Sequence, residues 1–233
     1  MQVANISIAS WLAKNRLAIS YWILGLFHGF GLWGMTTQYK DWFVQATPLT
    51  LVICTALVFW NERGINKGFI GFASLAFFTG YFSEVIGVHT QLLFGNYAYG
   101  ETLGVKVADV PILIGINWFI TVYASIHVVH KLLAFVPQIR AANSLFFTLL
   151  FAMLVGLVTT AFDYIMEPGA IRLGYWQWFP NNVIPVYNYV CWFIISSFIA
   201  GVFAYFQLKS KNQIVIALLL IQALFFIGIK IWI

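Results

Sequence analysis

Seven apolar stretches follow one another along this 233-residue chain, and most are long enough to cross a lipid bilayer. An apolar segment of roughly 18 residues or more is typical of a membrane-spanning helix. Hydrophobic residues make up 62% of the chain, above the roughly 45–50% of soluble domains. We therefore expect an all-α integral membrane protein, a bundle of seven helices with the second the shortest. The expected spans are residues 17–36, 44–60, 67–88, 111–135, 143–164, 185–207 and 213–231.

The links between these stretches are mostly short, which leaves no room for a separate soluble domain. We therefore expect residues 1–233 to form a single transmembrane domain. No small-residue cleavage site follows the first apolar stretch, so we expect it to be retained rather than removed as a signal peptide. Cys54 and Cys191 fall inside predicted helices, and two such cysteines support neither a disulfide framework nor a metal cluster.

Basic residues are divided unequally between the two sides of the predicted bundle. With seven helices, the N-terminus and every even-to-odd link share one side, which carries eight basic residues against four opposite. Links rich in Lys and Arg stay on the cytoplasmic side, so we expect the N-terminus on that side of the membrane. A bacterial inner membrane is the expected location. Because the net charge of +5 is spread over many links, we expect no nucleic-acid partner. The eight residues are Lys14, Arg16, Arg63, Lys67, Lys131, Arg140, Lys209 and Lys211, and the four are Lys40, Lys106, Arg172 and Lys230.

Two long links, residues 89–110 and 165–184, follow the same pattern. Glu84 and Asp163 precede them, and a glycine and two aromatic residues lie eleven, thirteen and fifteen positions after each acid. A proline, and a tryptophan seven positions after it, complete both copies. We interpret this as an internal duplication of a two-helix unit, over about residues 80–120 and 159–194, relating helices 3–4 to helices 5–6. The matched pairs are Gly95 and Gly174, Tyr97 and Trp176, Tyr99 and Trp178, Pro111 and Pro185, and Trp118 and Trp192.

The duplication predicts where the acids lie. Both copies begin on odd helices, so they run in the same direction and place Glu84 and Asp163 at one depth on one side. A carboxyl group beside hydrocarbon is costly to ionise and indicates a functional site. Glu167 lies one helical turn after Asp163 and could share its pocket. However, Pro168 disfavours helical geometry at the residue before it, so we expect Glu167 to begin the loop. The alternative for these acids is that they cap loop amides or pair with Arg172.

Other side chains suit fewer kinds of chemistry. The aromatic residues of the two long links either belong to interfacial belts or shelter a carbocation through cation–π attraction. Four scattered histidines are too few for a membrane di-iron oxygenase, although His89 lies in the first long link and is a candidate site residue. Lys230 is three residues from the end, which excludes a retinal Schiff base at mid-membrane. The chain has no diphosphate-binding aspartate repeat, phosphate loop or Rossmann fingerprint, so no metal and no cofactor are expected.

The two motif regions together resemble the membrane carotenoid biosynthesis family that contains the CruF-type carotenoid end-group hydratases. The resemblance covers roughly residues 80–195. Gln91 and Leu93 stand where a glycine and a proline are expected, and Ile184 replaces a glycine, which puts substrate preference in doubt. The first half rests on Glu84, Gly87-Val88-His89-Thr90, Phe94-Gly95, Tyr97, Tyr99, Val110-Pro111 and Trp118, and the second on Asp163, Arg172-Leu173-Gly174-Tyr175-Trp176, Trp178, Pro185, Asn188 and Trp192.

The resemblance implies cofactor-independent addition of water across the terminal isopropylidene double bond of an acyclic carotenoid end group. Glu84 and Asp163 would be the acid and base, in either order, and Asn188 or His89 would orient water. A protonated carboxyl in a dry pocket can protonate an alkene, and a second carboxylate can take a proton from water. Expected partners are an acyclic or monocyclic carotenoid, membrane lipids and other carotenoid pathway enzymes. Further candidates for contact with substrate or water are Tyr97, Tyr99, Trp118, Glu167, Arg172, Trp176, Trp178 and Trp192.

Two alternatives stay open from the sequence. A lycopene-type carotenoid cyclase also begins by protonating a double bond, but it closes a ring instead of admitting water. A non-catalytic carotenoid or lipid carrier, or a transporter with a carboxylate proton relay at its repeat interface, would use the same residues without chemistry.

Overall fold

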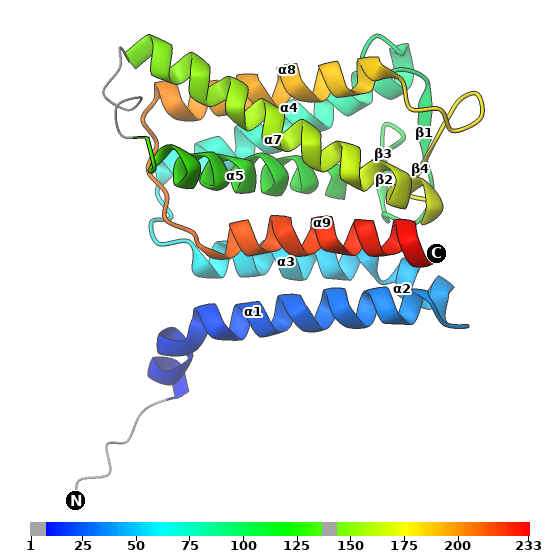
Figure 1. Ribbon diagram of the computed structural model, residues 1–233, viewed down its shortest axis with the longest axis horizontal. Coiled ribbons are helices and arrows are strands. Elements are labelled where there is room, and N and C mark those ends of the chain that lie inside the picture. The colour runs from blue at the N-terminus through cyan, green and yellow to red at the C-terminus, as the bar shows by residue number, and fades with distance from the viewer. Residues whose placement is uncertain (1–7, 137–143) are drawn as a thin grey trace, which may run out of the picture.

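The computed structural model describes residues 8–136 and 144–233, and this part of the chain is mostly helical. Figure 1 shows the long helices side by side along one direction, with the strands and the C-terminus at one end of the bundle. The helices are α1 (Ile8–Met35), α2 (Lys40–Gln45), α3 (Thr47–Asn61), α4 (Lys67–Thr90), α5 (Leu113–Leu133), α7 (Ser144–Arg172), α8 (Val186–Tyr205) and α9 (Ile214–Trp232). The strands are β1 (Tyr97–Tyr99), β2 (Lys106–Val107), β3 (Val110–Pro111) and β4 (Trp176–Trp178).

The expectation of seven long membrane spans is wrong for the second segment. Within the described residues, six helices are long and apolar enough to cross a membrane, which indicates a multi-pass membrane protein. Helix α3 has 15 residues, about 22 Å at 1.5 Å per residue, which is short of the roughly 30 Å hydrocarbon layer. Helix α3 starts only at Thr47, because residues 40–45 form the separate helix α2, and Pro48 lies in the first turn of α3. Helix α3 nevertheless returns the chain from the strand end to the opposite end (Figure 1).

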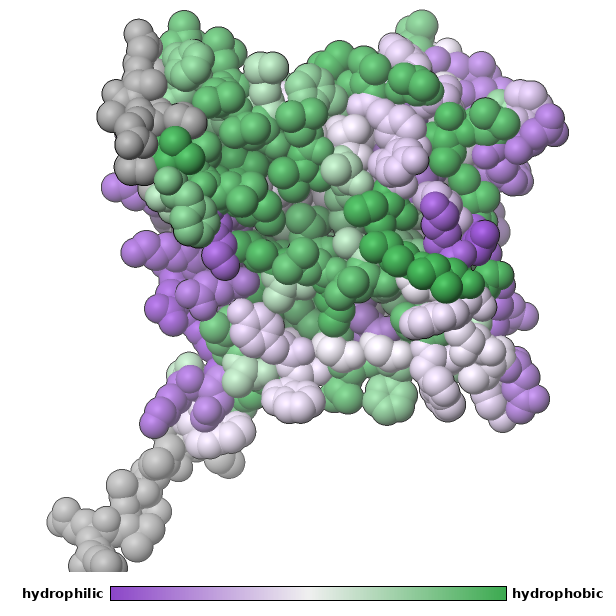
Figure 2. Space-filling model, in the orientation of Figure 1, coloured by the Kyte–Doolittle hydropathy of each residue, from purple (hydrophilic) through white to green (hydrophobic). Residues whose placement is uncertain are grey.

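The surface has the polarity that a bilayer requires. Figure 2 shows hydrophobic residues across the middle of the visible face, with hydrophilic residues gathered toward the two ends of the bundle. Large apolar side chains on the long helices are exposed, including Trp22, Phe78, Ile194 and Leu224. A continuous exposed apolar surface of this kind is stable against lipid tails and unstable in water. Arg140, one of the basic residues counted for the orientation, lies outside the described residues.

The two long links lie at one end of the bundle, on one side as the sequence predicts, and they meet there through strands that the all-α expectation lacked. Strands β1 and β4 pair antiparallel, with Tyr97 opposite Trp178, Ala98 opposite Gln177 and Tyr99 opposite Trp176. Two further backbone hydrogen bonds extend the pairing on either side, at 2.9 Å each. This pairing satisfies backbone groups that would otherwise be unpaired close to lipid. The duplication itself stays a prediction.

Helix α7 contradicts the expectation that Glu167 begins a loop. The helix continues through Pro168 to Arg172. Proline removes one backbone hydrogen bond, but packing supports the last turn, because Gly169 approaches Phe226 of α9 so closely that a Cβ would lie 2.8 Å from its ring. Tyr175 N also donates to Ala170 O at 3.0 Å after the helix end. Glu167 therefore lies one helical turn from Asp163 on the same face of α7.

Helices α4 and α5 approach closely at Gly80. A Cβ built on Gly80 would lie 2.1 Å from Cγ of Trp118, so only glycine fits against this ring. Trp118 is fully buried and stacks on Trp192 of α8, with ring centroids 3.8 Å apart and an interplanar angle of 10°. The position of this buried tryptophan pair therefore depends on the missing side chain at residue 80.

We predict that Gly80→Ala destabilises the protein by about 1–3 kcal/mol, the usual cost of overpacking a buried contact. Gly71→Ala, on the same helix, is the matched control because a Cβ at this position would have no neighbour within 4 Å. It should be neutral or slightly stabilising, since alanine favours helix more than glycine does. Thermal unfolding of the two detergent-solubilised variants, followed by size-exclusion chromatography, measures the difference. Equal melting temperatures would contradict the packing at Gly80.

We also predict that Ala98→Cys with Gln177→Cys forms a disulfide, because these residues oppose each other in β1 and β4. Directly opposed residues in an antiparallel pair have Cα atoms about 4.5–5.5 Å apart, within the range of a disulfide. If the strands face the oxidising side of the membrane, the bond forms in cells without added oxidant. Thiol labelling before and after reduction detects it, with Ala98→Cys alone as control. If the disulfide forms only with added oxidant, the strands face the cytoplasm, opposite to the expected orientation. If no disulfide forms even with oxidant, the pairing of β1 with β4 is contradicted.

Candidate active site

Aromatic donors from strand β1 and helix α5 converge on the carboxylate of Glu84. This side chain is 4% exposed. Its Oε2 accepts hydrogen bonds from the Tyr97 hydroxyl at 2.5 Å and the Tyr99 hydroxyl at 2.8 Å, and its Oε1 accepts one from Trp118 Nε1 at 3.0 Å. Burial raises the pKa of both Tyr97 and Tyr99 well above the usual range, and the neighbouring Glu84 adds to the rise. Both tyrosines therefore keep their protons and remain donors.

Glu167 has a matching set of hydrogen-bond donors from strand β4. It is 2% exposed, and its Oε2 accepts hydrogen bonds from Trp176 Nε1 at 2.9 Å and Trp178 Nε1 at 3.0 Å. Its Oε1 accepts one from Asn188 Nδ2 at 3.3 Å. Each glutamate is thus bound by the two rings of the strand that follows it in sequence. In its contacts, the counterpart of Glu84 is Glu167, one turn beyond the Asp163 that the sequence pattern matched to it.

Asp163 is the least hydrogen-bonded of the three acids. It is fully buried, and its Oδ2 accepts a hydrogen bond from Asn188 Nδ2 at 2.9 Å. Its Oδ1 has no hydrogen-bond partner among the described residues. An unpaired oxygen inside a membrane-spanning bundle is costly unless a proton, a water or a ligand satisfies it. Asn188 bridges Asp163 and Glu167 with one amide group, so its NH₂ is directed at the acids.

The three acids line one small buried pocket, which we call the acid pocket. Its volume is about 20 Å³, enough for a single water molecule. No lysine, arginine or histidine lines it. Three carboxyl groups in a dry pocket without a cation cannot all be ionised, because like charges repel strongly there. The lining residues are Glu84, Phe94, Tyr97, Tyr99, Ile114, Asn117, Trp118, Asp163, Met166, Glu167, Trp176, Trp178, Asn188 and Trp192.

A larger apolar groove adjoins the acid pocket. It has a volume of about 310 Å³ and is lined by residues of α1, α2, α3, α5, α7 and α9. The acid pocket and the groove share four lining residues, so the two spaces are neighbours. Leu26, Phe30 and Leu49 line the outer part of the groove and are half exposed or more. The groove therefore opens on the lipid-facing surface between α1 and α3. The shared residues are Ile114, Asn117, Met166 and Trp176.

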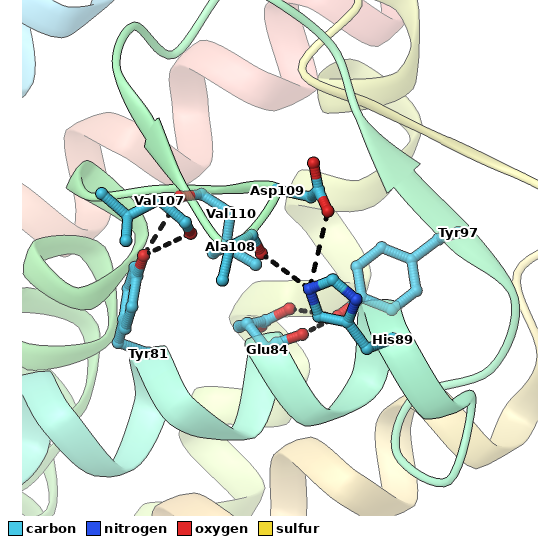
Figure 3. A network of polar contacts seen from close by, with 8 residues as sticks. All are labelled: Tyr81, Glu84, His89, Tyr97, Val107, Ala108, Asp109 and Val110. Carbon is cyan, nitrogen blue, oxygen red and sulfur yellow. Dashed lines mark hydrogen bonds and ion pairs between the residues drawn. The ribbon is translucent and has the colours of Figure 1, made fainter.

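Two predicted site residues lie outside both spaces. His89 is on the surface, where its Nε2 lies 3.2 Å from Ala108 O and 3.5 Å from a carboxylate oxygen of Asp109 (Figure 3). Figure 3 also shows Tyr81 bonded to Val107 and Val110 of the same link. Arg172 Nη1 donates to Lys230 O at 2.5 Å and so caps the end of α9 instead of pairing with an acid. His89 and Arg172 thus hold the loop and the helix end.

Sequence reasoning missed Asn117. Its side chain lines both the groove and the acid pocket, and no hydrogen bond to it is found among the described residues. A polar residue inside an apolar helix was the available signal, but Asn117 precedes Trp118 and lies outside the repeated pattern. Met166 and Ile114 were equally hidden, since an apolar residue in a membrane helix carries no functional signal. Among the described residues, no group of three or more His, Cys, Asp and Glu side chains is arranged to hold a metal ion.

Comparison with known proteins identifies a family. A model of the family described as carotenoid biosynthesis protein matches residues 43–233, which include every residue that lines the acid pocket. No curated protein and no solved structure matches the chain. Because the family match covers most of the sequence and the whole acid pocket, the chain belongs to the carotenoid biosynthesis protein family.

Proposed function

We propose that the protein is a cofactor-independent carotenoid hydratase, which adds water across the terminal isopropylidene double bond of an acyclic end group. One observation carries the proposal: three buried carboxyl groups without a cation surround a pocket of about 20 Å³ next to an apolar groove of about 310 Å³. Family membership supports a carotenoid-related substrate. An apolar end group that enters the groove from the lipid would bring its double bond to the acids.

Hydrogen bonding supports assigning the proton donor to Asp163. Donors reach both oxygens of Glu84 and of Glu167, which favours their ionised forms. No donor among the described residues reaches Oδ1 of Asp163, so this oxygen is free to carry the acidic proton. Asp163 transfers this proton to the less substituted carbon of the double bond, whose π electrons form the new C–H bond. The other carbon becomes a tertiary cation.

The remaining steps need a stabilised cation and one water. The carboxylates of Glu84 and Glu167 and the faces of the stacked Trp118 and Trp192 lower the energy of the cation. A water oxygen then forms the C–O bond and loses a proton to Glu167. The proton then returns from Glu167 to Asp163, which lies one turn away on α7. The balance is one alkene plus one water to one tertiary alcohol.

Asn117 is the side chain best suited to hold the attacking water. It lies where the groove meets the acid pocket, and its amide offers both donors and an acceptor. Polar partners and a volume for one water favour hydration over cyclisation, because a cyclase must exclude water from the cation. Of the two residues expected from the sequence to orient water, Asn188 already donates its NH₂ to two acids, and His89 lies on the surface beside Ala108.

We predict that Asp163→Asn lowers formation of the hydrated product at least about a hundredfold, the usual contribution of a general acid. Glu84→Gln and Glu167→Gln should each cause a loss of similar size by removing charge that faces the cation. Glu101→Gln is the matched control, because this glutamate is exposed and pairs only with Lys106 in the described part. Pigment mass after expression in a lycopene-producing host measures the outcome. Full activity of Asp163→Asn would refute the assignment, and a product without added mass would indicate the cyclase instead.

We predict that Asn117→Leu separates protonation from hydration. Without a held water, the cation loses its proton again, so in D₂O the recovered substrate should gain deuterium while the alcohol falls at least about tenfold. Asn117→Ser, which keeps a hydrogen-bonding group, should recover part of the hydration. Mass spectrometry of substrate and product measures both quantities. A parallel loss of exchange and hydration would show that Asn117 only supports the pocket.

A further inference from the structure

A second buried polar cluster lies at the opposite end of the bundle from the acid pocket. Glu62, at the end of α3, is 6% exposed, and its Oε2 accepts hydrogen bonds from the Tyr123 hydroxyl, Ser210 Oγ at 3.0 Å and Asn212 Nδ2 at 3.3 Å. Ser210 and Asn212 belong to the link between α8 and α9. This cluster therefore ties the α3–α4 link to the α8–α9 link, at the end where Figure 1 shows both links.

Neighbouring residues of the same two links point the other way. Ser210 and Asn212 bind Glu62, whereas Lys211 and Gln213 line a surface pocket of about 100 Å³. Likewise Glu62 faces the cluster, while Asn61 and Arg63 line the pocket. Neighbouring side chains of these two segments therefore divide between the buried cluster and the surface pocket. The buried cluster thus holds both walls of the pocket in place.

Helix α1 supplies the third wall through Arg16 and Leu17. Arg16 Nη1 donates to Trp60 O at 3.3 Å, and Arg16 O accepts from Ser20 Oγ at 2.7 Å. Ser20 Oγ in turn accepts from Asn61 Nδ2 at 2.7 Å. Asn61 is 4% exposed, so a fixed polar side chain forms the floor, and Arg16 is held beside it.

The pocket contains three cations and no acid. Its lining residues are Arg16, Leu17, Asn61, Arg63, Lys211 and Gln213. None of the three cations forms an ion pair within the described part of the chain, and Glu62, the acid nearest in sequence, directs its bonded oxygen to the buried cluster. Converging positive charges repel each other, and an anion placed between them removes that cost. Arginine is suited to phosphate oxygens because its N–H groups form paired hydrogen bonds with them.

We propose that this pocket binds a phosphate group, carried by an anionic membrane lipid or by a soluble phosphate ester. Two exposed tryptophans lie near Arg16: Trp11 precedes it on α1, and the backbone carbonyl of Trp60 accepts its hydrogen bond. Tryptophan is enriched at the depth of lipid headgroups. Basic pockets between membrane helices on the cytoplasmic side bind anionic headgroups, and the distribution of basic residues in the sequence predicts that this end faces the cytoplasm. The site is independent of the acid pocket and of the reaction proposed for it.

The test measures phosphate binding to the detergent-purified protein by native mass spectrometry. We expect phosphatidylglycerol to be retained in preference to phosphatidylcholine. Arg16→Gln with Arg63→Gln should reduce retention at least about tenfold, because each basic residue near the surface contributes to attraction of anionic lipid. Lys67→Gln with Lys209→Gln is the matched control, since both lysines are exposed but do not line the pocket. This control should retain the lipid.

Separate arms identify the source of the phosphate. Displacement of the lipid from the unmodified protein by millimolar inorganic phosphate would indicate a soluble ester. Persistence of the lipid under the same phosphate would indicate a lipid headgroup. If removing Arg16 disturbs folding, as a lowered melting temperature would show, Lys211→Gln alone tests the site, because this lysine is exposed. Equal retention by the pocket variants and the lysine control would overturn the proposal.

Discussion

The pairing of β1 with β4 is the interaction on which the acid pocket depends. Carboxyl groups inside a bundle that crosses a membrane need hydrogen-bond donors from the protein, since lipid offers none. The helices supply Trp118 and Asn188, and the paired strands supply the other four donors. Antiparallel pairing brings the rings of two distant links into one layer beside the acids. Without it, Glu84 and Glu167 would each lose two donors.

The donors divide the three acids into two kinds. Glu84 and Glu167 are each held by the rings of the strand that follows them, whereas Asp163 shares only the amide of Asn188. This arrangement matches two glutamates by their contacts and leaves the aspartate as an additional group. An acid with a free oxygen beside two well-bonded carboxylates suits the proton transfer that we propose, because different environments separate the pKa values of neighbouring acids. Hydrogen bonding, more than burial, distinguishes the three acids, because all three are buried.

The sequence predicted six of the seven expected spans, the placing of the two long links on one side, and the aromatic residues that bond to Glu84 and Glu167, because apolar length and repeated spacing are local signals. It failed where tertiary contacts decide. Pro168 indicates a helix end, but α9 packs against the last turn of α7 and keeps it helical. Strands of three residues are too short to show the alternation of apolar and polar residues that predicts a strand, so β1 and β4 were recognised only from their pairing in the structure. Arg172 gave a plausible partner for an acid, and only the position of α9 shows that it caps that helix.

The relation between the groove and the acid pocket limits how water can take part. An apolar end group that fills the groove displaces solvent from the opening between α1 and α3, which isolates the acid pocket from bulk water. The space of about 20 Å³ then holds one molecule, and Asn117 lies at the boundary where that molecule would meet the double bond. In the proposed reaction, a tertiary cation formed there would meet this one water and, among the pocket's lining residues, no cation that raises its energy. If the proposed hydration takes place here, the geometry that keeps bulk water out would leave the one held water to capture the cation.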